Sequence, residues 1–162
     1  MRILLTALDE EDDASAAIVK LLKPQTECKK LYLSKEDGKS AQELIKELET
    51  GAYDKVISFE ENDMIQDKIY IEIVAKSNGH KIQTSFDYKS LCRHIRATGY
   101  PVTVSINAGE GYGNSLYYQA LSFIADKKAN IDMIFLHIPS LSKMTDSLNF
   151  ARAIEHSLDR IY

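Results

Sequence analysis

Residues 101–114 read PVTVSINAGEGYGN and contain a complete strand, a turn and the start of a helix. The β-branched residues at 102–106 predict a short strand, and the glycines at 109–113 predict a turn. Asn114 is a good helix N-cap residue, so a helix is expected to begin there. The helix should bury an apolar stripe formed by Tyr117, Ala120, Leu121 and Ile124. A strand that passes through a short turn into a helix is typical of α/β folds.

The same alternation continues in both directions along the chain. Further strands are expected at residues 3–5, 31–33, 55–59, 68–75 and 131–138. Helices are expected between them, with Ser40 and Glu43 as a capping box and Asp87 as an N-cap. The apolar stripes of the first and last helices should include Leu21 and Leu148.

This order of elements predicts one domain, residues 1–162, with a three-layer α/β/α architecture. The central sheet is expected to be mixed but mostly parallel, and to carry helices on both faces. It should contain the strands near residues 3, 57, 104 and 134. The strands at 55–59 and 68–75 are separated only by a polar turn and could pair as neighbours.

Composition narrows the classes of function. The 162 residues are 44% hydrophobic and 27% charged, which suits a folded domain with its own core. The formal net charge is -4, so no basic field attracts nucleic acid or an anionic membrane. Cys28 and Cys92 are too few for a disulfide scaffold and lack the spacing of a zinc site. Near the N-terminus, a short apolar run meets an acidic cluster at 9–13, which fits neither a signal peptide nor a membrane span. We expect a soluble, cytoplasmic protein.

Four segments of the chain match the motifs of one known family. Residues 96–109, RATGYPVTVSINAG, look like R-A-x-G-x-P-x-x-x-S-x-x-A-G. Residues 135–139, FLHIP, are similar to F-[IL]-H-[VI]-P, and residues 69–75, IYIEIVA, to I-x-x-E-R-V-A. The opening MRILLTA resembles M-[KR]-I-L-[VL]-T-G. These are motifs of pyroglutamyl peptidase I (pyrrolidone-carboxylate peptidase), and the order of elements agrees along nearly the whole chain. The resemblance implies a pyroglutamyl-peptidase-like fold of the phosphorylase/hydrolase type.

The resemblance also implies a site. In the family, a Cys at the start of a helix attacks a peptide carbonyl, a His accepts its proton and a Glu orients the imidazole. The match places His137 and Glu72 at the last two positions. It places Gly113 at the nucleophile position, because the family's A-G-x-Y-x-C-N corresponds to AGEGYGN here. A glycine supplies no thiol, so classical thiol aminopeptidase activity is not expected.

Three loops depart from the family as well, at residues 8–13, 63–66 and 76–88. In the family, the counterparts of the first and last of these help to form the pyroglutamate pocket and the subunit contacts. Two hypotheses follow. The chain is a pseudoenzyme that binds a peptide or small molecule, or it is a hydrolase of altered mechanism that uses His137 and Glu72 on a peptide or small amide. Homo-oligomers remain open under both hypotheses.

Each candidate residue has a structural alternative. His137 could be a satisfied core group, and Glu72 could face solvent from its strand. Ser115 is a candidate for a relocated nucleophile, although a serine in the first turn of a helix usually bonds the backbone. The glycines at 109–113 could form an anion or oxyanion site, or could only permit a tight turn. The remaining histidines lack metal-ligand spacing, so no metal or cofactor is expected.

Overall fold

The computed structural model describes residues 1–36 and 38–161, which form eight strands, five α-helices and one short 3-10 helix. In chain order they are β1 (Ile3–Leu8), α1 (Ala14–Leu21), β2 (Cys28–Leu33), α2 (Lys39–Leu48), β3 (Lys55–Glu61), β4 (Ile69–Glu72), β5 (Val74–Ser77), β6 (His80–Gln83), α3 (Tyr88–Ala97), β7 (Val102–Ser105), α4 (Tyr112–Lys127), β8 (Asp132–Ile138), the 3-10 helix η1 (Leu141–Lys143) and α5 (Ser147–Leu158).

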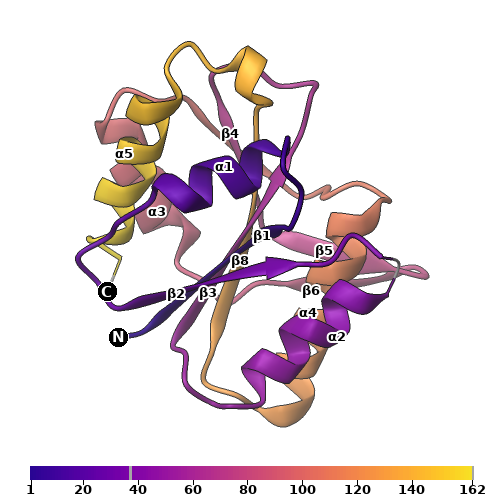
Figure 1. The fold of residues 1–162 in the computed structure, drawn as a ribbon. Coiled ribbons are helices and arrows are strands. Elements are labelled where there is room, and N and C mark those ends of the chain that lie inside the picture. The colour runs from indigo at the N-terminus through magenta and orange to yellow at the C-terminus, as the bar shows by residue number, and fades with distance from the viewer. Residues whose placement is uncertain (37, 162) are drawn as a thin grey trace.

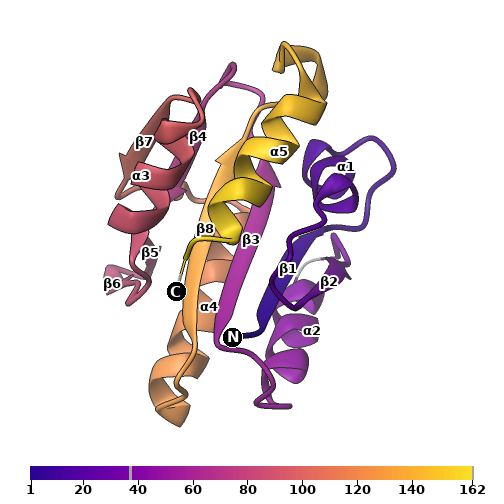
Figure 2. The ribbon, with the colours of Figure 1, turned by 90° about the vertical axis from the view of Figure 1, so that its left-hand side faces the viewer.

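Six of the strands form one sheet in the order β2-β1-β3-β8-β4-β7. Neighbouring strands are parallel except β4 and β8, which are antiparallel. Helices α1, α3 and α5 cover one face, and α2 and α4 cover the other (Figures 1 and 2). The predicted three-layer α/β/α architecture with a mostly parallel mixed sheet is therefore confirmed.

The sheet separates two apolar cores because successive side chains on a strand point to opposite faces. On β8, Ile134 and Leu136 belong to the core under α1, α3 and α5. Met133 and Phe135 belong to the core under α2 and α4. His137 continues the second series, so its side chain points to the face of the sheet that α4 covers.

The predicted pairing of strands 55–59 and 68–75 is wrong. Strand β8 lies between β3 and β4, and the predicted strand 68–75 is interrupted at Ile73. The Ile73 amide still donates to the Ser105 carbonyl of β7 at 2.9 Å, but its own carbonyl accepts from Thr84 at 3.0 Å. The chain thus leaves the large sheet at Ile73, and β5 pairs with β6 in a separate two-stranded hairpin.

Two predicted helix caps are also wrong. The N-cap of α2 is Gly38, while Ser40 is buried inside the helix and Glu43 accepts from the backbone amide of Ser34. The N-cap of α4 is Gly111, so Asn114 lies within the first turn of the helix. The predicted Asp87 cap of α3 is confirmed, because its carboxylate accepts from the Ser90 amide at 3.1 Å.

The apolar stripes of the outer helices differ from the prediction at their ends. Leu21 and Leu148 are 41% and 47% exposed. Helix α1 instead buries Val19, and α5 instead buries Phe150. Helix α1 packs on the sheet and on α5, and α5 contributes Phe150 to the same apolar core. These neighbours decide which face of each helix is buried, and a single sequence does not show where they lie.

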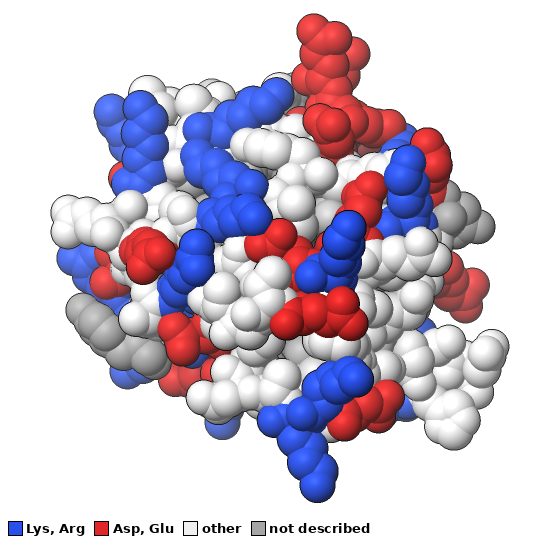
Figure 3. Space-filling model, turned by 60° about the horizontal axis from the view of Figure 1, so that its bottom comes forward, with Lys and Arg blue, Asp and Glu red and all other residues white. Residues whose placement is uncertain are grey.

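Charged side chains of both signs are interspersed on the face shown in Figure 3. Within residues 1–36 and 38–161, no helix combines the length and apolar character needed to cross a membrane.

Candidate functional site

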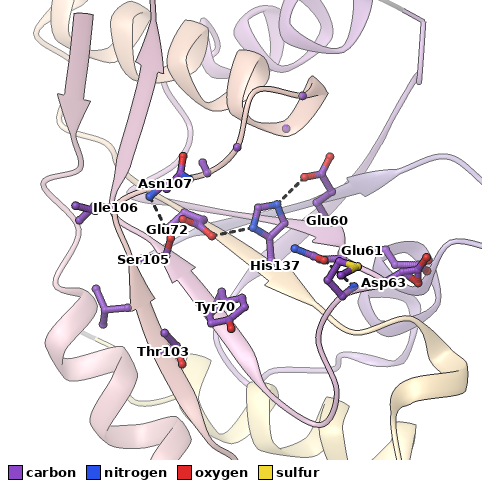
Figure 4. Close-up of a pocket in the computed structure, with 17 residues that line it drawn as sticks. Glu60, Glu61, Asp63, Tyr70, Glu72, Thr103, Ser105, Ile106, Asn107 and His137 are labelled. Carbon is purple, nitrogen blue, oxygen red and sulfur yellow. Dashed lines mark hydrogen bonds and ion pairs between the residues drawn. The ribbon is translucent and has the colours of Figure 1, made fainter. Parts of the chain in front are cut away.

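Strand register brings four polar side chains into one row across the sheet. Glu60 of β3 lies opposite His137 of β8, His137 opposite Tyr70 of β4, and Tyr70 opposite Thr103 of β7. Glu72 lies two residues beyond Tyr70 on β4 and therefore points to the same face. The row lies at the floor of a pocket, with His137 between Glu60 and Glu72 (Figure 4).

Both ring nitrogens of His137 contact a carboxylate. Nδ1 lies 2.9 Å from Glu72 Oε1, and Nε2 lies 2.8 Å from Glu60 Oε2. An ionised carboxylate only accepts, so both contacts are hydrogen bonds when both nitrogens carry a proton. Burial disfavours the charged ring, but the hydrogen bonds and charges of Glu60 and Glu72 outweigh it and raise the pKa of His137 from 6.5 to about 9. At neutral pH the ring is an imidazolium.

Glu60 occupies the space that a side chain at position 113 would need. A Cβ atom added to Gly113 would overlap Glu60 Oε2 and would lie 2.6 Å from Phe135 Cζ. These distances are far inside van der Waals contact, so a larger residue at 113 requires Glu60 to move. The site thus has a carboxylate from β3 where the resemblance expects a thiol from α4.

Aromatic packing holds the imidazole in place. The ring of Phe135 meets the His137 ring edge to face, with centroids 5.3 Å apart, and stacks on Tyr117 at 5.5 Å. Tyr117 is fully buried on α4, and its hydroxyl donates to the backbone carbonyl of Glu72 at 3.0 Å. One helix therefore fixes both β4 and β8 beneath the site.

The pocket above this row has a volume of about 780 Å³. Its wall includes backbone and side chains of residues 103–109 and the loop residues Asn62, Asp63 and Met64. Among the residues that the structure describes, its lining contains four carboxylate side chains and no Lys or Arg. The site is therefore open to a ligand and carries negative charge.

No protein-family model and no curated protein matches the chain. Solved structures do match it. Pyroglutamyl peptidase I from Bacillus amyloliquefaciens superposes with a TM-score of 0.79 over 96% of this chain and 95% of its own, at 20% sequence identity. A mutant pyrrolidone carboxyl peptidase from the hyperthermophile Pyrococcus furiosus gives a TM-score of 0.84 over 99% and 98%, at 19% identity. The enzyme from Thermococcus litoralis gives 0.81 over 97% and 91%, at 16% identity. This chain has the pyroglutamyl peptidase I fold.

Within this pyroglutamyl peptidase fold, the structure brings together three of the four candidate residues. Glu72, His137 and Gly113 line one pocket, and Gly113 lies in the first turn of α4. Ser115 is exposed, lines a neighbouring pocket and accepts from Gln119 Nε2 at 3.1 Å. It does not lie with His137, so the geometry gives no support to a relocated serine nucleophile.

At one position of the glycine-rich turn, the backbone conformation itself favours a glycine. Gly109 has φ +85°, a conformation that favours glycine, so a tight turn is required there. The alternative role as an anion site meets an obstacle, because the Glu60 carboxylate lies against Gly113 at the start of α4. A second anion there would be repelled.

Sequence reasoning missed Glu60. The sequence predicts a strand that ends at Phe59, with Glu60 in the polar turn after it. Glu60 and His137 are both near the carboxyl ends of strands, where side chains of adjacent parallel strands meet. That signal becomes specific only once β3 and β8 are known to be neighbours.

Among residues 1–36 and 38–161, no group of three His, Cys, Asp or Glu side chains is arranged to hold a metal ion. Cys92 is buried and Cys28 is partly buried, and burial raises the pKa of both thiols. Neither lines the pocket.

Proposed function

We propose that this chain is a pyroglutamyl-peptidase-like protein that binds a small molecule or peptide end in this pocket and lacks thiol peptidase chemistry. The observation that carries the proposal is the position of Glu60. Its carboxylate fills the volume that a side chain at 113 would need, and it contacts the Nε2 nitrogen of His137 at hydrogen-bonding distance. A nucleophile and a free base are both missing from the position where the family performs its attack.

The charge of His137 argues against the alternative hydrolase. A general base must be unprotonated at the working pH, and the pKa of His137 is raised to about 9. Its two nitrogens are also already engaged by Glu60 and Glu72. Water or a substrate would have to displace Glu60 before His137 could accept a proton. We place this binding role in the reducing cytoplasm, which suits two free cysteines.

The test is release of a fluorescent amine from its L-pyroglutamyl amide. We expect no turnover from the wild-type protein under conditions in which the Bacillus amyloliquefaciens enzyme, the positive control, is active. Turnover that is lost in both His137→Gln and Glu60→Gln, with circular dichroism showing that both variants are folded, would establish the altered hydrolase instead.

A further inference from the structure

One carboxylate oxygen of Glu72 has no hydrogen-bond partner among the described residues. Glu72 is only 2% exposed, and its Oε1 atom is held by His137. Its Oε2 atom is buried and makes no hydrogen bond to any residue that the structure describes. A buried charged acceptor left unpaired is costly, and such groups in proteins are nearly always satisfied. Because Glu72 lines the pocket, a turn of its carboxylate toward the pocket would let a bound hydrogen-bond donor supply the missing partner.

The negative charge of the pocket favours a ligand whose hydrogen-bond donor is positively charged. Of the four lining carboxylates, Asp63 lies 3.9 Å from Lys143 Nζ, and Glu61 accepts from the neutral Ala14 amide at 2.8 Å, which leaves its negative charge in place. Glu60 and Glu72 remain, and they share the single positive charge of His137. With no Lys or Arg among the described lining residues, the pocket keeps an excess of negative charge around Glu60, Glu61 and Glu72.

The rim of the pocket is apolar on two sides. Met64 follows β3 and is 91% exposed, and Ile106 follows β7 and is 64% exposed. Both line the pocket. A ligand with a short apolar body could cover these side chains while its polar end reaches the floor.

We propose that the pocket binds a small organic cation that carries N–H donors, a primary ammonium on an apolar body, with the ammonium donating to Glu72 Oε2. The inference rests on the proposed binding function and names its ligand class. The unpaired oxygen of Glu72 calls for a ligand with an N–H donor. The negative charge of Glu60 and Glu72 favours a ligand that is positively charged, and the exposed side chains of Met64 and Ile106 favour one with an apolar body.

Three probes separate these contributions on the wild-type protein. n-Butylammonium has the charge and the donors, n-butyltrimethylammonium has the charge alone, and n-butanol has neither charge nor ammonium donors. Each is titrated at pH 7.5 while backbone amide NMR shifts are followed. We expect saturable shifts at residues 103–113 with n-butylammonium, and binding of the other two at least tenfold weaker. No saturable shift with n-butylammonium, or equal binding of the trimethyl analogue, would overturn the proposal.

A variant locates the contact. Glu72→Gln keeps the shape of the side chain and removes its charge, and it should weaken n-butylammonium binding at least tenfold. Glu49→Gln, on the exposed end of α2, makes the same change in net charge and should bind as wild type. Unchanged binding by folded Glu72→Gln would refute the site. Failure of these titrations leaves the pyroglutamyl amide assay unaffected, so loss of this inference and loss of the proposed function are distinguishable.

Discussion

Glu60 and any side chain at position 113 compete for one small volume, which predicts an interaction between two substitutions. Gly113→Ala should destabilise the protein by about 1–3 kcal/mol, because the added Cβ overlaps Glu60 and Phe135. In Glu60→Ala the carboxylate that overlaps the added Cβ is absent. Gly113→Ala should therefore lower the free energy of unfolding less in the Glu60→Ala protein than in the wild type. The free energy of unfolding, measured by urea denaturation of the four proteins, gives the coupling. Additive effects would show that Glu60 does not occupy this space.

The charge of His137 predicts a pH dependence of stability. The pKa of His137 is about 9 in the folded protein and about 6.5 when unfolded, so the folded state binds the proton more tightly. The protonated His137 therefore adds to the free energy of unfolding. This stabilisation is fully present below pH 6.5 and is lost as the pH rises through 9. It amounts to about 3 kcal/mol at most.

Denaturation curves at pH 6, 7.5 and 9.5 measure this loss. In Glu60→Gln one of the two carboxylates no longer supports the imidazolium, so the loss should be smaller and should occur at lower pH. Glu49→Gln serves as the control and should follow the wild-type profile. A wild-type stability that does not fall between pH 6.5 and 9 would contradict the imidazolium assignment.

Among the elements, the hairpin of β5 and β6 depends on one side chain of α4. Asn114 is 8% exposed, and its amide acts like a strand neighbour for Lys76: Oδ1 accepts from the Lys76 amide at 2.9 Å and Nδ2 donates to the Lys76 carbonyl at 2.7 Å. Asn114→Ala would leave both backbone groups without this partner. We expect a loss of about 1–3 kcal/mol in the free energy of unfolding.

The adjacent Ser115→Ala is the matched control, because Ser115 is exposed and its hydroxyl bonds only the Gln119 side chain among the described residues. It should change the free energy of unfolding by less than about 0.5 kcal/mol. Equal effects of the two substitutions would mean that the Asn114 contact does not hold the hairpin.

Asn114 also explains why the N-caps of helices are harder to predict from the sequence than the helices and strands themselves. Asn114 was expected to cap α4 because asparagine suits that position locally, yet its partner is 38 residues away in the chain. The expected capping box of Ser40 and Glu43 failed similarly, since Glu43 instead binds the amide of Ser34 in the preceding loop. Short polar side chains satisfy several roles, and tertiary contacts choose among them. Asp87 kept its predicted role because its partner, Ser90, is local.

For the whole molecule, the order of strands predicts which parts open first. Strands β1, β3 and β8 lie in the interior of the six-stranded sheet and are almost entirely buried. Strand β6 pairs only with β5 and is mostly exposed. Hydrogen exchange should therefore be slowest at the amides of Ile57 and Ile134 and much faster at Lys81. Comparable protection of Lys81 would mean that the hairpin unfolds only with the whole domain.

For the whole molecule, the sequence is sufficient to predict the three-layer α/β/α architecture, because apolar periodicity determines which segments become strands and helices. It was not sufficient for the site. Glu72 and His137 were singled out through family motifs, and the structure places them in contact. Glu60 belongs to no such motif, and its importance depends on β8 inserting between β3 and β4. Strand order depends on the whole chain, so a residue defined by its cross-strand neighbour stays hidden until that order is known.

The overlap between Glu60 and position 113 also constrains how this site can change over generations. A chain with a side chain at 113 has no room for a glutamate at 60 in this orientation, so Glu60 must turn away or be replaced. A protein that gains a side chain at 113 while it keeps Glu60 pays the cost of moving that carboxylate, so a change at one position favours a change at the other. In a set of related sequences, the two positions should therefore vary as a pair.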